Sequence, residues 1–177
     1  MMKKIIIILL LIIVLSNLNK IQAEEVIIPH EAIRLRVIAN SNTPHDQHLK
    51  TLVRDNTKHE VYQLLKGINS FEEARVAILS GLPTIKQTVE QTLKQASSLQ
   101  SYEVTYGDNY FPEKQYKGVK YQAGYYESLL IKLGKGQGDN WWCVLFPPLC
   151  LIEADEASEV EYKFFITELI NKYFKKK

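Results

Sequence analysis

The strongest constraint on this chain is an uninterrupted apolar run near its start, because that run does not belong to the part that folds. Residues Ile5 to Leu15 carry no polar side chain, and Lys3 and Lys4 precede them. As a helix this run would rise only ~16 Å, about half of the ~30 Å hydrocarbon core of a membrane. A positively charged start followed by so short an apolar run is typical of a secretory signal peptide.

The residues after this run favour removal of the signal. The chain turns polar after Leu15, and the small residue Ala23 comes directly before Glu24. We therefore expect residues 1–23 to be a signal peptide, with an uncleaved anchor as the alternative. Residues 24–177 are then expected to form a single extracytoplasmic domain, because ~150 residues suffice for one core and no linker or repeat divides them.

The charge of the remaining domain argues against nucleic-acid binding. The whole chain has 22 Lys and Arg against 20 Asp and Glu, and residues 1–23 hold three of the lysines and no acid, so residues 24–177 have 19 against 20. The nominal isoelectric point of about 8.4 therefore reflects a segment that we expect to be removed. We expect no nucleic-acid partner, because a nearly neutral domain lacks the basic surface that such binding needs.

Hydrophobic periodicity predicts an α+β fold. We expect a largely antiparallel sheet with an N-terminal strand, three central helices and a C-terminal helix. Alternating apolar residues predict the first strand at residues 32–40, and Thr43 followed by Pro44 predicts a helix that runs to about Leu65. The other helices are expected at residues 71–80, 83–97 and 157–174.

Further strands are expected in the second half of the chain. Apolar and aromatic residues alternate from Tyr102 to a turn signal at residues 107–109. Two more strand candidates, residues 125–133 and 141–146, flank a glycine-rich run, which predicts a hairpin with a flexible tip. A phosphate-binding loop is the weaker interpretation, because such a loop leads into a helix and this run leads into a strand.

Catalytic patterns are weak in this sequence. His45 and His48 are three residues apart, so a metal site would still need a distant third ligand. Cys143 has Trp142 and Val144 as neighbours, and neither supplies a base that could activate a thiol. We therefore expect no catalytic residue, no metal and no cofactor, and keep an extracytoplasmic cysteine or metal-dependent hydrolase as an alternative.

The two cysteines, Cys143 and Cys150, leave their redox state open. An exported domain permits a disulfide, and closing so short a loop would stabilise it by roughly 2–2.5 kcal/mol. Two buried free thiols are the competing interpretation. A mass measurement before and after reduction would distinguish them.

The segment from Trp141 to Cys150, which reads WWCVLFPPLC, is the densest candidate for a binding surface. Tryptophan is enriched in interface hot spots, although large aromatic side chains also fill cores. Strand alternation would place Trp141, Cys143 and Leu145 on one face and Trp142, Val144 and Phe146 on the other. We expect one of the two faces to be shared with a partner.

Three blocks of the sequence together resemble the stage II sporulation protein R family. They are RLRVIANSNTPHDQHLKTLVRD (Arg34 to Asp55), YFPEKQYKGVKYQAG (Tyr110 to Gly124) and GYYESLLIKLGKGQGDNWWCVLFPPLC (Gly124 to Cys150). The resemblance implies a protein made in the forespore and exported into the space between the forespore and mother-cell membranes. There it would trigger a membrane-embedded aspartic protease, its receptor, which processes the precursor of sigma E. The chain would act as a signalling ligand and not as an enzyme.

The resemblance also implies candidate partner-binding residues. In the first block they are Asn40, Ser41, Asp46, Gln47, Lys50, Arg54 and Asp55. In the last block they are Trp141, Trp142, Phe146, Pro147 and Pro148. Each has a structural alternative: the first two could simply form the turn, Arg54 could pair with Asp46 or another acid, and the aromatic side chains could simply pack.

A membrane-surface module is the second alternative function. The last predicted helix is apolar around much of its girth, with Phe164, Phe165 and Tyr173 among its residues, and lysines follow at 175–177. Such a helix could make peripheral contact with anionic lipid. Burial of this helix against the sheet is the ordinary explanation.

Overall fold

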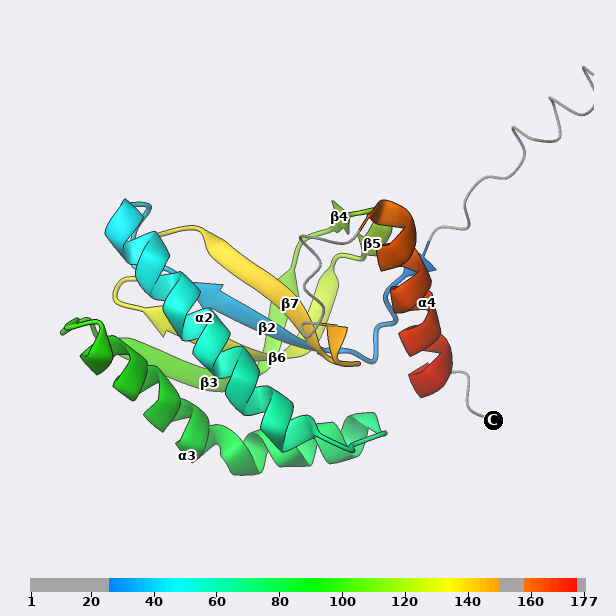
Figure 1. The fold of residues 1–177 in the computed structure, drawn as a ribbon, viewed down its shortest axis with the longest axis horizontal. Helices are drawn as coiled ribbons and strands as arrows, with labels where there is room; N and C mark the ends of the chain where they lie inside the picture. The colour runs from blue at the N-terminus through cyan, green and yellow to red at the C-terminus, as the bar shows by residue number, and fades with distance from the viewer. Residues whose placement is uncertain (1–25, 150–157, 175–177) are drawn as a thin grey trace, which may run out of the picture.

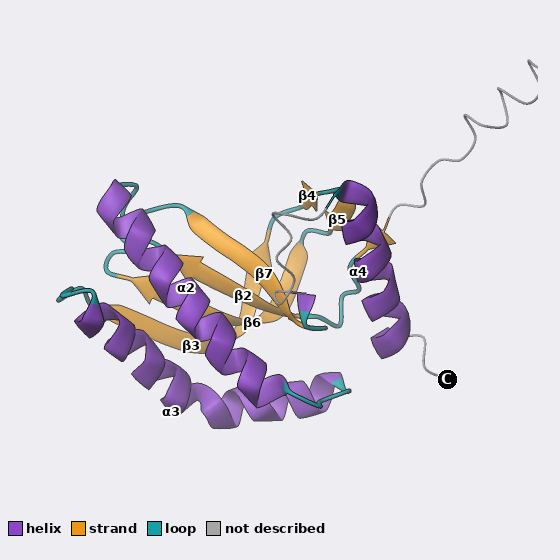
Figure 2. Cartoon of the chain, in the orientation of Figure 1, coloured by secondary structure: helices purple, strands orange, loops and turns teal. Residues whose placement is uncertain are grey.

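The main sheet has four strands in the order β3-β6-β2-β7 (Figures 1 and 2). This computed structural model describes residues 26–149 and 158–174, so the predicted signal peptide lies outside the described residues. The strands are β2 (Ile33–Ile38), β3 (Tyr102–Phe111), β6 (Gly124–Leu133) and β7 (Asn140–Phe146). The predicted α+β class is confirmed.

The sheet is mixed, so the prediction of a largely antiparallel sheet is correct only in part. β2 lies in the middle, parallel to β6 and antiparallel to β7, while β3 pairs with β6 antiparallel. Because β2 has neighbours on both sides, most of its side chains are buried on both faces, including Arg34. The alternation in the sequence indicated a strand but not its central position.

The predicted hairpin between β6 and β7 is wrong. The two strands are neighbours in the sequence, but β2 lies between them in the sheet. The turn predicted at residues 107–109 is also wrong, because β3 continues through them and pairs with β6 as far as Phe111. Asn109 Nδ2 donates to Ser128 Oγ at 2.9 Å, so the long pairing with β6 outweighs local turn preference.

A second, smaller sheet has the order β1-β5-β4, which the sequence analysis missed. β1 (Val26–Ile27) is parallel to β5 (Val119–Tyr121), and β5 pairs antiparallel with β4 (Lys114–Tyr116). Strands of two or three residues are too short to show a periodic pattern.

The described residues contain two central helices where three were predicted. α2 runs from Pro44 to Leu65, and α3 is one helix from Phe71 to Gln95. Its buried stripe of Ile78, Gly81 and Ile85 crosses the expected break. A Cβ on Gly81 would lie 2.4 Å from a methyl carbon of Leu64 on α2, so the glycine allows close packing of the helices and does not end one. The two helices cover one face of the sheet and bury the main core against it.

The C-terminal helix, α4 (Glu159–Phe174), confirms the predicted element, and its expected start at residue 157 lies outside the described part. It buries Tyr162 and Ile166 in a second core with Val119 and Val144. Among the described residues, no helix combines the length and apolar character needed to cross a membrane.

Candidate interaction surfaces

A polar network joins the start of α2 to the loop between β6 and β7, and it contains five of the predicted contact residues. We call it the junction network: Asn40, Ser41, Asp46, Gln47 and Lys50, with Gln100 and the loop residues Lys135 and Asp139. Asp46 is its centre. The Asp46 carboxylate accepts from Asn40 Nδ2 at 2.9 Å, from Ser41 Oγ at 2.5 Å and from Gln100 Nε2 at 2.9 Å.

The hydrogen bonds to Asp46 change its acidity. Asp46 is only 6% exposed, yet its pKa is lowered to about 2 by the side chains of Ser41, Gln100 and Asn40, which together outweigh the opposing effect of burial. A carboxylate that accepts several hydrogen bonds favours its ionised form. Asp46 is therefore a charged structural centre.

The loop between β6 and β7 is held against the turn that precedes α2. Lys50 Nζ donates to the Asp139 carbonyl at 3.1 Å, and the Lys135 amide donates to Asn40 Oδ1 at 2.9 Å. A Cβ on Gly138 would lie 2.3 Å from the Ser41 carbonyl oxygen, so only glycine permits this approach. The glycine-rich run packs at a junction, where the sequence predicted a flexible tip.

The remaining polar candidate residues meet the aromatic segment at the middle of α2. Arg54 pairs with Asp55 through Nε–Oδ1 at 2.7 Å and Nη2–Oδ2 at 3.0 Å, and its guanidinium carbon lies 5.2 Å from the centre of the Trp141 ring. Lys58 Nζ lies 5.8 Å from the same ring. The structural alternative for Arg54, a pair with Asp46 or another acid, is confirmed with Asp55 as the acid.

The end of β7 lies beside α4. Phe146 and Pro147 are buried, and the Phe146 ring contacts Tyr173 edge to face, with centroids 5.1 Å apart. Pro148 lines a small pocket of about 140 Å³ with Tyr62, Leu145 and Tyr173. Phe146 and Pro147 thus pack, whereas Pro148 is partly exposed.

Cys143 lies on β7 and is disulfide-bonded. Cys150 lies outside the described residues, so its pairing with Cys143 stays a prediction.

Trp142 lies on the opposite face of the sheet from Trp141, as alternation predicted. The predicted place of Phe146 on the Trp142 face is wrong, because a register shift between Ile33 and Arg34 interrupts the alternation and Phe146 packs in the main core with Leu145. Its ring meets Phe111 edge to face at 6.0 Å. Two cations also lie near it, Lys114 Nζ at 4.7 Å and the Arg36 guanidinium carbon at 5.9 Å from the ring centre. Its Nε1 is buried and has no hydrogen-bond partner.

Arg34, next to this group on β2, is 4% exposed. Its guanidinium carbon lies 3.5 Å from the centre of the Tyr126 ring, and Nη2 donates to the Gln122 carbonyl at 3.3 Å, while Nε is buried without a partner. Burial lowers the pKa of Arg34, and Tyr126 and Tyr121 partly offset this. Sequence reasoning gave Arg34, Arg36 and Lys114 no role; arginines alternating within an apolar strand were the available signal.

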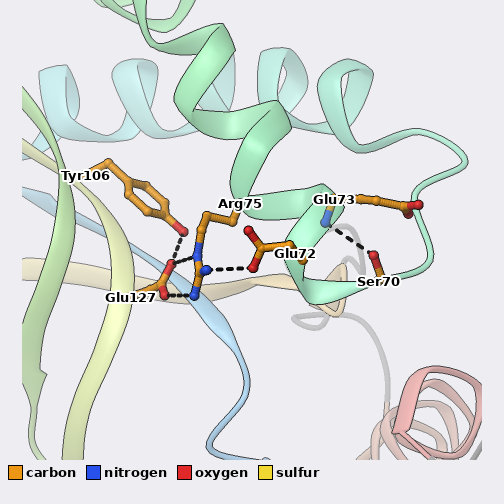
Figure 3. Close-up of polar contacts among 6 residues, drawn as sticks. All are labelled: Ser70, Glu72, Glu73, Arg75, Tyr106 and Glu127. Carbon is orange, nitrogen blue, oxygen red and sulfur yellow. Dashed lines mark hydrogen bonds and ion pairs between the residues drawn. The ribbon is translucent and has the colours of Figure 1, made fainter.

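The helix-covered face holds a contrasting charged group (Figure 3). Arg75 on α3 forms a two-pronged ion pair with Glu127 on β6, through Nε–Oε2 at 2.8 Å and a second, shorter contact, and also donates to Glu72 at 2.6 Å. Tyr106 donates its hydroxyl to Glu127 at 2.7 Å. The hydrogen bond from Arg75 is the main cause that lowers the pKa of Glu127.

The alternative of a metal-dependent hydrolase gains no support here. Within residues 26–149 and 158–174 no group of three or more His, Cys, Asp or Glu side chains could hold a metal ion. His45 and His48 are both exposed on α2.

Comparison with known proteins agrees with the sequence resemblance. The family model described as stage II sporulation protein R matches residues 29–156. The curated protein named stage II sporulation protein R from Bacillus subtilis (strain 168) is 44% identical over 142 residues. The alignment covers 80% of this chain and 63% of that relative, so the chain spans less than two thirds of the relative's length. No solved structure matches.

Proposed function

The chain belongs to the stage II sporulation protein R family, and on that premise we propose that it is an exported signalling ligand of endospore formation. It leaves the forespore and enters the space between the two membranes. There it activates a membrane-embedded aspartic protease of the mother cell, and that protease processes the sigma E precursor. The family match over residues 29–156 is the observation that carries this proposal.

The described surfaces are compatible with a ligand. The junction network uses Asn40, Ser41, Asp46, Gln47 and Lys50 within the chain, so we propose that these residues hold the shape of the domain. Exposed or partly exposed candidates remain on both faces, including Arg54 with Trp141 on one and Trp142 on the other. These residues are the better candidates for receptor contact.

Co-expression tests this function directly. The full chain, the candidate membrane protease and the sigma-factor precursor are produced together in a host that does not sporulate, and precursor cleavage is followed by immunoblot. We expect cleavage only when all three are present and when residues 1–23 are intact. Cleavage by a form lacking residues 1–23 would contradict the export step, and cleavage without this chain would contradict the ligand role.

A control separates signalling from hydrolysis. Cys143→Ala removes the sulfur that a cysteine hydrolase would use once its disulfide is reduced, and His45→Ala removes an exposed imidazole. If the protein is a ligand, His45→Ala leaves precursor cleavage unchanged, and the purified chain turns over no peptide or cell-wall substrate. Turnover that His45→Ala or Cys143→Ala abolishes in a folded protein would favour the enzyme.

A membrane-surface module is a second candidate, favoured by one observation. Phe164 on α4 is 72% exposed and Phe165 is 39% exposed, although Ile166 beside them is fully buried. Exposed aromatic side chains on a helix suit a membrane interface. Flotation of the full chain with anionic liposomes tests this; binding that Phe164→Ser weakens would support it, and equal binding would oppose it.

A further inference from the structure

We propose that the sheet face opposite α2 and α3 docks an acidic segment of the protein partner, a proposal that rests on the proposed function because that partner is the receptor protease. The site is a row of four side chains across the sheet, which we call the open row: Trp142, Arg36, Leu130 and Thr105. Strand pairing places them side by side on β7, β2, β6 and β3. Lys114 of β4 reaches the Trp142 ring.

The open row is accessible. Both long helices lie on the other face, and within the described residues the small sheet and α4 bury this face at its Val144 end. Trp142, Arg36 and Leu130 are half-buried, and Thr105 and Lys114 are exposed. An extended segment could therefore lie along the row, with an apolar side chain against Trp142 or Leu130.

The charges at this site lack carboxylate partners in the part of the chain that the structure describes. Arg36 Nε donates to the neutral Asn140 side chain at 2.9 Å, and Lys114 Nζ lies 4.7 Å from the centre of the Trp142 ring. The ion pairs among the described residues involve other side chains. A half-buried cation without a counter-ion is costly, so a carboxylate placed beside Arg36 would offset part of that cost.

A protein segment fits this site better than a lipid surface. One of the two cations, Arg36, is an arginine set in the sheet, where a planar guanidinium suits paired hydrogen bonds to a carboxylate. Residues 24–177 carry 19 basic and 20 acidic side chains, so no general attraction to an anionic membrane is expected. The attraction of an acidic segment to this face is therefore expected to come from the cations at the site and not from the net charge of the domain.

The first test needs no receptor. The full chain, labelled with ¹⁵N, is titrated with a peptide of ten glutamates and with a matching glutamine peptide, and the two indole N–H resonances are followed by NMR. We expect the Trp142 resonance, assigned through Trp142→Phe, to shift with the acidic peptide and much less with the neutral one. The Trp141 resonance, on the other face, should move less.

Charge reversal sharpens this test. The double variant Arg36→Glu, Lys114→Glu should weaken peptide binding about tenfold or more. The matched control is Lys86→Glu, an exposed lysine of α3 outside the open row. It should keep binding within about twofold. Equal binding by the double variant and the control, absence of any Trp142 shift, or a shift caused by phosphatidylglycerol vesicles but not by the peptide would overturn the proposal.

The second test uses the receptor. In the co-expression system, a photo-crosslinking residue is placed at Thr105 or, as a control, at Lys86. We expect capture of the protease at Thr105 through a segment that mass spectrometry identifies as acidic. Normal precursor cleavage with crosslinks from Lys86 and none from Thr105 would overturn the docking site while leaving the signalling function standing. Peptide binding at Trp142 without precursor cleavage would support the docking site and contradict the signalling function.

Discussion

On the helix-covered face of the sheet, Arg75 meets Glu127 and Glu72, whereas on the opposite face Arg34 and Arg36 meet rings, a carbonyl and an amide. The same residue type is therefore used in two ways within one domain. Contact with Glu127 raises the pKa of Arg75, while burial lowers the pKa of Arg34 and of Arg36. The charges of the first face are paired within the domain, whereas Arg34 and Arg36 on the second face have no carboxylate partner among the described residues.

The largest effect on stability is expected from removing Asp46, the centre of the junction network. Asp46→Ala should lower the free energy of unfolding by about 3 kcal/mol, because three side-chain donors lose their acceptor at a buried position. Urea denaturation measures it. The neighbouring exposed His45→Ala should change stability by less than about 0.5 kcal/mol. Similar values for both variants would show that the network contributes little.

Lowering the pH should reveal the contribution of Asp46 to stability. The pKa of Asp46 is about 2 in the folded chain and near 3.8 in its ordinary state, so its contribution is fully present above pH ~4 and is lost as the pH falls through about 2. This difference corresponds to about 2 kcal/mol. The stability lost between pH 5 and pH 2 should be smaller in Asp46→Asn. Parallel pH curves for Asp46→Asn and the unaltered chain would contradict this.

Breaking the ion pair of Figure 3 should have a smaller effect. Glu127→Gln should cost about 1.5 kcal/mol, because Arg75 and Tyr106 lose a charged acceptor that is largely shielded from water. Thermal unfolding followed by circular dichroism measures this. Glu72→Gln serves as the control and should change little, since its side chain is 66% exposed. A larger loss of stability for Glu72→Gln than for Glu127→Gln would contradict the view that Glu127 is the more important partner of Arg75.

The smallest effect on stability is expected at Arg34, on the sheet face opposite α2 and α3. Arg34→Met should leave the free energy of unfolding within about 1 kcal/mol of the unaltered chain, because an apolar side chain replaces a buried cation without a counter-ion. Urea denaturation measures this. A loss of several kcal/mol would mean that Arg34 builds the fold as Arg75 does.

The limits of sequence reasoning follow from where each signal resides. The helix start at Thr43 was predictable because its side chain caps the helix locally and accepts the amide hydrogen bond that capping requires, and Ser70 caps α3 in the same way. The continuity of α3 through Pro83 was not predictable, because it depends on Leu64 packing against Gly81 from another helix. A capping contact between neighbouring residues can be predicted from the sequence, whereas a packing contact between distant residues that extends a helix cannot.

The candidate site shows the same limit. The polar residues near Asn40 were conspicuous in the sequence, and the structure shows that they bond to one another and to the loop after β6. The pairing of Trp141 with Arg54 required the register of two distant elements. That Arg34 has no carboxylate partner among the described residues could not be read from its neighbours in sequence, because pairing depends on the folded chain.

The central place of β2 constrains when the domain can form. Arg34 pairs with Ser128 on one side and Val144 on the other, so both neighbours of this early strand come from the last third of the described chain. A chain that emerges with its N-terminus first presents β2 long before either neighbour exists. Closing such distant contacts is slow. The domain would therefore stay unfolded until nearly all of it has emerged, which is the state that passage through a narrow translocation channel requires.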